Sequence, residues 1–173
     1  MYEVRVITEI LSEENISLHK EYVRQMRLRY SILESDLPRL RGASVLELSR
    51  LRLDKRDFKD ALELLPEIVL HDIFFDSFTD KKYTRSEAVT LRYGSEANLL
   101  NELYRLSKGA RYGFLVVGRD TRASLVSDYV DAFKLGDPIL AVDLFEHSYF
   151  LDYGFDRERY VLNCLSHLNL KKL

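Results

Sequence analysis

Two residues with metal-binding side chains stand four positions apart, just after an apolar segment. Residues 139–142 are apolar, Asp143 follows them directly, and His147 comes four positions later. A carboxylate at the end of a strand and an imidazole one helical turn beyond it can point at the same place. Two residues alone form a weak motif, because a capping aspartate beside an ordinary histidine gives the same pattern.

His19 and His71 supply the other half of a candidate metal site. Each lies on the apolar side of a separate predicted helix, in a chain with only four histidines. A single histidine in such a position is more often a hydrogen-bonded core residue, but two of them together with Asp143 and His147 favour a metal site. Three imidazoles and one carboxylate suit iron or manganese, with zinc as a further candidate, whereas magnesium and calcium prefer oxygen ligands. The fourth histidine, His167, is interpreted as structural or exposed.

The first half of the chain is predicted to be helical. Ser12 can cap a helix with an acidic first turn, and apolar residues recur at helical spacing through residues 16–30. We expect a break at residues 36–38. A second helical pattern covers residues 57–75, in which Pro66 must lie at a helix start or at a kink.

The second half of the chain alternates between helical and strand patterns. The helical patterns cover residues 95–108, where Gly109 ends an amphipathic helix, and residues 156–168. Segments rich in strand-forming residues lie at 112–117, 123–129 and 139–143. Helices followed by a small antiparallel sheet with flanking helices predict an α+β fold.

Composition argues against several classes of protein. With 26 basic and 28 acidic side chains, the chain shows no basic excess of the kind that nucleic acid binding requires. The single cysteine, Cys164, cannot form an internal disulfide and is expected to be buried. The N-terminus has no long apolar region, and no stretch approaches the roughly 20 apolar residues of a membrane span. We therefore predict a cytoplasmic protein that binds neither nucleic acid nor a membrane.

The segment 143–153 resembles a family signature. It reads DLFEHSYFLDY, which is similar, without a gap, to the D-x-W-E-H-x-Y-Y-x-x-Y signature of iron/manganese superoxide dismutases. His71 with the following Phe74 and Phe75 is similar to the family's N-H-x-x-F-W, and residues 109–115 are similar to its G-S-G-W-x-W-L. The helix start before His19 resembles the family's first helix. The resemblance covers nearly the whole chain, with residues 31–62 the poorest match.

The resemblance implies a fold, a metal site and an activity. The fold is an N-terminal helical hairpin, residues 1–80, followed by an α/β lobe with a three-stranded antiparallel sheet, residues 81–173. One iron or manganese ion per chain would lie between the lobes. The implied ligands are His19, His71, Asp143 and His147. The implied activity is the conversion of superoxide to oxygen and hydrogen peroxide by redox cycling of the metal.

The resemblance also implies roles for residues around the ligands. Arg27 occupies the position of the family's gateway tyrosine. Glu67 occupies that of a glutamine that bonds the metal-bound solvent; a neutral glutamine can donate this bond, but an ionised glutamate can only accept. Glu146 matches a glutamate that reaches the partner's ligand histidine across a two-fold interface, and Tyr149 matches a tyrosine at the same interface. We expect Glu67, Arg27 and Tyr149 to take part in catalysis, and Glu146 to indicate a homodimer.

The family's cavity tryptophans have no counterpart, because the chain contains no tryptophan. Four aromatic side chains are the expected replacements: Phe75, Tyr112, Phe114 and Phe145.

Three functional hypotheses remain open at this point. The first is a working superoxide dismutase, favoured by the complete ligand set. The second is a metal-binding relative with lost or altered activity that serves as an interaction or structural protein, favoured by the changed residues around the ligands. The third is an unrelated metal-dependent oxidoreductase or hydrolase, because a fold does not determine a function.

Overall fold

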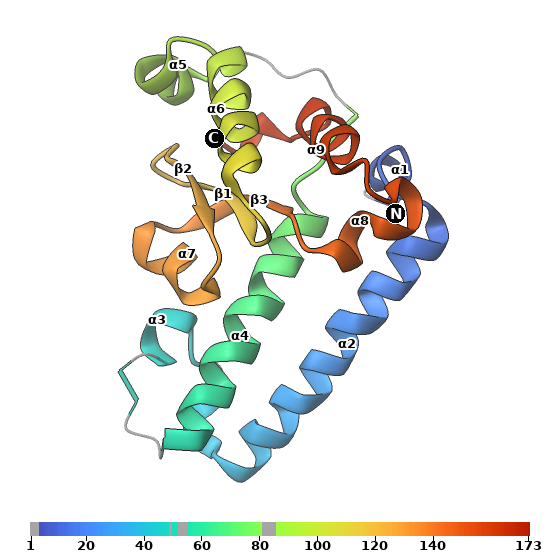
Figure 1. The fold of residues 1–173 in the computed structure, drawn as a ribbon. Helices are drawn as coiled ribbons and strands as arrows, with labels where there is room; N and C mark the ends of the chain where they lie inside the picture. The colour runs from blue at the N-terminus through green and yellow to red at the C-terminus, as the bar shows by residue number, and fades with distance from the viewer. Residues whose placement is uncertain (1–3, 49, 52–54, 81–85) are drawn as a thin grey trace.

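The N-terminal half of the protein is helical and is dominated by two long helices. A computed structural model describes residues 4–48, 50–51, 55–80 and 86–173. The two long helices, α2 (Glu13–Asp36) and α4 (Lys55–Phe75), lie side by side as a hairpin (Figure 1). The predicted helical hairpin is therefore present. Three short elements accompany it, namely α1 (Val4–Ile7), the 3-10 helix η1 (Pro38–Leu40) and α3 (Val45–Leu48).

Both ends of α2 follow from the local sequence. The Ser12 hydroxyl accepts a hydrogen bond from the Asn15 backbone N–H at 3.1 Å, and two glutamates in the first turn favour the positive end of the helix. The helix ends at Asp36, where the Leu37 N–H bonds the Leu33 carbonyl and Pro38 begins the next element. The predicted cap and the predicted break are both confirmed.

The second long helix continues through its proline. Pro66 lies inside α4, so the expectation that it could mark a helix start is wrong. Proline has no N–H to donate, and the helix loses one hydrogen bond at this point. Burial of the side chains on both sides of Pro66 offsets this loss, because Leu64 and Ile68 pack against α2, and Leu70 and Phe74 enter the main core.

The C-terminal half contains the predicted three-stranded sheet. The central strand is β1 (Phe114–Gly118), which pairs antiparallel with β2 (Ala123–Val126) and with β3 (Pro138–Asp143), giving the order β2-β1-β3. In this register Phe114 is paired with Asp143, the last residue of β3. The α+β fold class is confirmed, and the register places Asp143 at one edge of the sheet.

Helices cover the sheet and follow its last strand (Figure 1). The prediction of a strand through Tyr129 is wrong beyond Val126, because Asp128 caps a new helix that begins at Tyr129. The predicted amphipathic helix is α6, which begins after the capping residue Ser95. The helices of this half are α5 (Glu87–Tyr93), α6 (Glu96–Gly109), α7 (Tyr129–Leu135), α8 (Glu146–Tyr153), α9 (Arg157–Ser166) and the 3-10 helix η2 (Leu170–Lys172).

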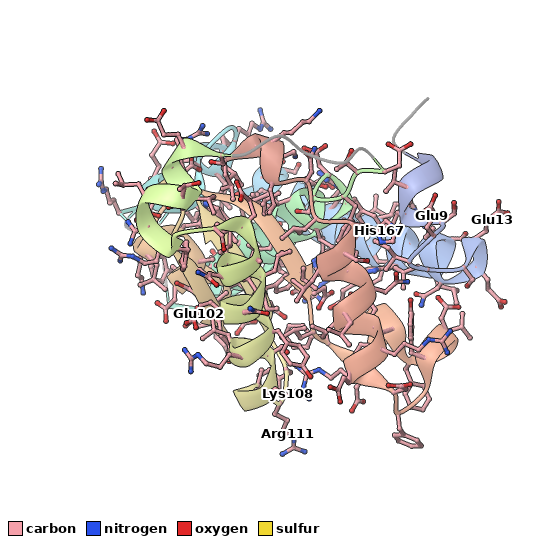
Figure 2. All side chains as sticks on the ribbon, turned by 90° about the horizontal axis from the view of Figure 1, so that it is seen from above. Glu9, Glu13, Glu102, Lys108, Arg111 and His167 are labelled. Carbon is pink, nitrogen blue, oxygen red and sulfur yellow. The ribbon has the colours of Figure 1, made fainter. Side chains whose placement is uncertain are left out.

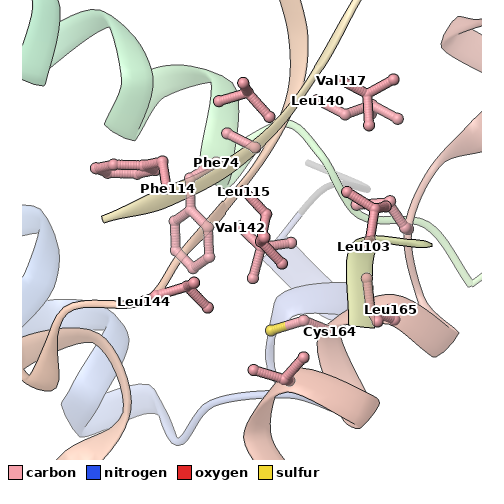
Figure 3. Close-up of a cluster of buried hydrophobic side chains, with 14 of the residues drawn as sticks. Phe74, Leu103, Phe114, Leu115, Val117, Leu140, Val142, Leu144, Cys164 and Leu165 are labelled. Carbon is pink, nitrogen blue, oxygen red and sulfur yellow. The ribbon is translucent and has the colours of Figure 1, made fainter. Parts of the chain in front are cut away.

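The main core joins the two halves of the chain. Figure 3 shows Phe74 of α4 beside Phe114 and Leu115 of the central strand, with Cys164 of α9 in the same cluster. Cys164 is fully buried, as predicted, and burial raises the pKa of its thiol. A smaller core between α2 and α4 contains Val23, Met26, Tyr30, Leu64 and Ile68.

The fourth histidine ties the chain before α2 to the last α-helix. Glu9 and His167 lie next to each other in Figure 2, and His167 Nε2 is 3.0 Å from Glu9 Oε2. The other ring nitrogen, Nδ1, is 2.9 Å from the backbone carbonyl oxygen of Asn163. These contacts agree with the structural interpretation of His167. Within the described residues, no helix is both long enough and apolar enough to cross a membrane.

Candidate metal centre

Four separate elements bring the four predicted ligands together. His19 comes from α2, His71 from α4, Asp143 from the end of β3, and His147 from the first turn of α8. One ligand atom from each side chain lies within 4.8 Å of all the others. Residues separated by more than a hundred positions along the chain therefore converge on one place.

The spacing of these atoms fits a single metal ion. Asp143 Oδ2 is 3.5, 3.3 and 3.1 Å from the Nε2 atoms of His19, His71 and His147. His71 Nε2 and His147 Nε2 are 3.4 Å apart. Ligand atoms about 2.1 Å from a shared ion, with angles of about 90–120° between them, lie roughly 3.0–3.6 Å from one another. These four distances fall in this range.

His19 gives independent support for a bound ion. Both of its ring nitrogens are buried and have no hydrogen-bond partner among the described residues. Burial lowers the pKa of this imidazole, and the neighbouring Asp143 only partly opposes that effect. A buried imidazole nitrogen without a hydrogen-bond partner is unusual in a protein core. A metal ion bound by the other three side chains would be a partner for one of the two nitrogens. The residues therefore fit iron or manganese.

The charge of Asp143 suits the same role. Burial alone would raise the pKa of its carboxyl, but the three neighbouring imidazoles hold that pKa well below its ordinary value. For His71, burial lowers the pKa, and contact with Asp143 outweighs that effect and raises it. Metal binding requires an ionised carboxylate and neutral imidazoles, so a metal ion would displace the second proton of any imidazole that carries two, and each ring would keep one N–H.

Hydrogen bonds from neighbouring residues hold the ligands in position. His71 Nδ1 lies 2.7 Å from the backbone carbonyl oxygen of Glu67, so Nδ1 carries the proton and Nε2 presents its lone pair to the site. Asp143 Oδ1 accepts a bond from the Phe145 backbone N–H at 2.8 Å, and the Ser148 hydroxyl donates to Asp143 Oδ2. Such contacts orient ligands and strengthen metal binding.

Aromatic rings surround the ligands, including the four expected in place of tryptophan. Ring centres are 5.0 Å apart for Phe75 and His19, 5.2 Å for Phe114 and His71, and 5.8 Å for Phe145 and His147. Tyr112 stacks on Phe145 at 5.5 Å. The side chains of His19, His71 and Asp143 have no exposed area. The surrounding rings therefore help to exclude solvent from most of the site.

Glu67 is buried beside the site, between two tyrosines. Its Oε1 accepts a hydrogen bond from the Tyr22 hydroxyl at 2.8 Å and a second from the Tyr129 hydroxyl at 3.1 Å. Burial raises the pKa of both phenols, and the charge of Glu67 adds to the effect. Contact of Glu67 with metal-bound solvent stays a prediction. Sequence reasoning missed both tyrosines, although Tyr22 stands three positions after His19 on the same helix.

Arg27 lies at the surface of the protein. Its side chain is 51% exposed, and its guanidinium pairs with the exposed carboxylate of Asp72. The ring beside the ligands is instead that of Tyr22, whose centre is 4.8 Å from the centre of His147 and 5.8 Å from that of His71. The gateway role of Arg27 stays a prediction.

Glu146 and Tyr149 both lie in α8 but differ in exposure. Glu146 is exposed in the first turn, directly before His147, whose side chain is 33% exposed. Tyr149 is buried, and its ring stacks on Tyr160 with centres 5.1 Å apart. The interface roles of Glu146 and Tyr149 stay predictions. The exposure of Glu146 is compatible with a contact to a second copy of the chain.

Known proteins resemble this chain in sequence. The family model described as "Iron/manganese superoxide dismutases, C-terminal domain" matches residues 81–173. An iron superoxide dismutase of Cupriavidus metallidurans is 31% identical over 104 residues, which are 54% of this chain and 53% of that protein. Chloroplastic iron superoxide dismutase 3 of Arabidopsis thaliana is 28% identical over 143 residues, 75% of this chain and 54% of the relative. Chloroplastic iron superoxide dismutase 2 of Oryza sativa subsp. japonica is 36% identical over 83 residues, 44% of this chain and 32% of the relative.

The chain thus spans about half the length, or less, of the relatives that it matches. The family model covers more than half of the chain, and its residues include Asp143 and His147. The fold, with a helical hairpin before a three-stranded antiparallel sheet, was predicted from the same resemblance and is observed. The chain therefore belongs to the iron/manganese superoxide dismutase family.

Proposed function

We propose that this protein is a superoxide dismutase that holds one iron or manganese ion on His19, His71, Asp143 and His147. The observation that carries the proposal is the convergence of the four ligand atoms within 4.8 Å of one another. Relatives named as iron superoxide dismutases support the same activity. Membership of this family argues against the hypothesis of an unrelated oxidoreductase or hydrolase.

Several residues of the site would contribute to this activity. A bound iron or manganese ion supplies one-electron redox chemistry, by which one superoxide is oxidised to oxygen and a second is reduced, with two protons, to hydrogen peroxide. Asp143 offsets the positive charge of the ion, and the Ser148 and Phe145 bonds keep its carboxylate in place. His147 is the one exposed member of the four, so small molecules reach the ligands from its side.

A second candidate is a metal-binding relative whose dismutase activity is lost or altered. Two observations favour it. Arg27, at the position of the family's gateway tyrosine, pairs with Asp72 at the surface. Glu67, at the position of the family's solvent-bonding glutamine, is engaged by two phenols. Such a protein would keep the fold and the ion and would act through interactions with other molecules.

A dismutation assay on metal-loaded protein separates the two candidates. We expect the loaded protein to accelerate superoxide decay and Asp143→Asn to abolish the acceleration, because the amide brings no charge to the ion. Asp76→Asn is the matched control, since this exposed carboxylate pairs with Lys172, and it should retain the activity. Full metal occupancy without acceleration would establish the second candidate.

We further propose that the protein forms a homodimer. The dimer proposal rests on Glu146, which is exposed directly before the ligand His147 and could reach the ligand of a second copy.

A further inference from the structure

A groove lined by arginines lies after the end of α2, on the segment that contains η1 and α3. Its volume is about 420 Å³, which is within the size range of small-molecule sites in proteins. The charged side chains that line it are three arginines and one glutamate, namely Arg39, Arg41, Arg50 and Glu47. We call this place the arginine groove.

The arginine groove is separate from the candidate metal centre. Asp36, the last residue of α2, follows His19 by 17 positions, about 25 Å along the helix axis. In Figure 1, α3 lies near the end of the hairpin at which α4 begins, and α8 lies near the other end. The family model matches only from residue 81 on, and residues 31–62 have the poorest resemblance to the family. The proposed dismutase activity therefore does not explain this groove.

Buried leucines fix the backbone that carries the arginines. Leu40 lies between Arg39 and Arg41 and is fully buried, and Leu48, two positions before Arg50, is equally buried. Both leucines belong to the smaller core between α2 and α4. Because this core anchors the backbone beside them, the three exposed arginines are held around one groove.

The arginine groove carries a net positive charge. Glu47 is the acidic residue of its lining, and its Oε2 accepts bonds from the Ser44 backbone N–H at 2.9 Å and from the Ser44 hydroxyl at 2.7 Å. These bonds lower the pKa of Glu47, so its negative charge offsets one of the three arginines. Arg41 Nε donates to the Glu34 backbone carbonyl at 3.3 Å, which steadies the side chain and keeps its charge.

We propose that the arginine groove binds a multiply charged phosphate chain, either that of a nucleotide or an inorganic polyphosphate. Guanidinium groups bind phosphate oxygens through paired hydrogen bonds and stay charged at physiological pH. Gly42 lines the same groove, and nothing lies within 4 Å of a Cβ added there, so an anion can approach the backbone closely. The volume of the groove favours a small molecule over a nucleic acid, which would need a longer basic surface.

Isothermal titration calorimetry with tripolyphosphate tests this inference on metal-loaded protein. The probe is supplied as its magnesium complex, so that it does not extract the bound ion. We expect binding that weakens as the salt concentration rises. The double variant Arg41→Gln, Arg50→Gln should lose at least about tenfold in affinity, because each guanidinium takes charge-assisted hydrogen bonds with it. The double variant Arg41→Lys, Arg50→Lys keeps both charges without the planar fork and should bind with intermediate affinity.

Arg24→Gln, Arg105→Gln is the matched control. Both arginines are exposed, and each pairs with a glutamate three positions earlier on its own helix. This variant loses the same two positive charges as the glutamine variant of the groove, and it should keep the affinity for tripolyphosphate. The magnesium complex of ATP, titrated in the same way, distinguishes the two sources of phosphate. Tighter binding of ATP than of tripolyphosphate would indicate a nucleotide, and weaker or equal binding an inorganic polyphosphate.

Three results would overturn the inference. The first is failure of the unsubstituted protein to bind either phosphate probe. The second is equal tripolyphosphate affinity in the groove variant and the matched control, as expected if the anion bound at the metal centre instead. The third is tighter binding of citrate than of tripolyphosphate, which would assign the groove to carboxylates. None of these results bears on superoxide decay, so the proposed function is tested separately.

Discussion

Most contacts within the candidate site involve Asp143. Its Oδ2 faces three imidazoles and accepts a bond from Ser148, its Oδ1 accepts from a backbone N–H, and its carbonyl accepts from Tyr160 at 2.8 Å. A carboxylate held at both oxygens cannot rotate freely. Folding has therefore already oriented the carboxylate, and metal binding does not have to offset the loss of its rotational freedom.

Ser148→Ala tests this contribution. The variant removes one hydrogen bond to Asp143 and leaves all four ligands in place. We expect metal affinity, measured by competition with a chelator, to fall about 10–100-fold, the usual loss when such a partner is removed. Ser166→Ala is the control, because Ser166 is exposed and bonds the Asn163 carbonyl. Equal affinities for the two variants would show that Asp143 does not need Ser148.

The sequence predicted the ligands better than the residues around them. Asp143 and His147 lie in one contiguous motif, and the convergence of all four ligands is observed. Arg27 follows His19 by eight positions, about 12 Å along a helix, and it lies on an exposed surface. Tyr22 follows by three positions, less than one turn. Tyr129 bonds the same Glu67 oxygen as Tyr22, and that bond depends on how α7 packs, which no local pattern encodes.

Gly113 controls the start of the central strand. Its φ is +122°, which side chains rarely adopt, and a Cβ there would lie 2.3 Å from the Val126 carbonyl oxygen. We expect Gly113→Ala to lower the free energy of unfolding by about 1–3 kcal/mol, measured by denaturant unfolding. Gly109→Ala should instead raise it by roughly 0.5–1 kcal/mol, because Gly109 is helical and nothing lies within 4 Å of its added Cβ. A stable Gly113→Ala variant would contradict this role of Gly113.

The first turn of α8 is where the proposed dimer can be tested. Glu146→Ala should weaken self-association and lower metal retention, because the glutamate is proposed to reach the partner's ligand histidine. Sedimentation and metal content measure the two effects. Glu87→Ala, which removes an acidic residue from the first turn of α5, is the control for a general helix-end effect. Unchanged association and metal content would contradict the proposed role of Glu146.

Long helices and the three strands were predicted well, and the short helices α5 and α7 were not. Helices α2, α6 and α9 and all three strands lie near their predicted positions. Helices α5 and α7 contain only seven residues each and were missed. Seven residues are two turns, too few to show a helical period above noise. Tyr129 also suits a strand by composition, and only the Asp128 cap indicates the helix.

The division of the whole chain at residue 80 stays a prediction. Leu70 and Phe74 share one core with Phe114 and Leu144, so this core includes side chains from both proposed domains. We expect a fragment of residues 81–173 to unfold without a cooperative transition in circular dichroism, because it lacks this part of the core and two of the four ligands. A sharp thermal transition would show that residues 81–173 fold alone.

Metal content tests the central proposal most directly. The protein is purified without added metal or chelator and analysed by mass spectrometry. We expect about one iron or manganese ion per chain, as a single four-ligand site requires, and a large loss in Asp143→Asn. Negligible iron and manganese, or zinc alone, would contradict the proposal that His19, His71, Asp143 and His147 hold a redox-active ion.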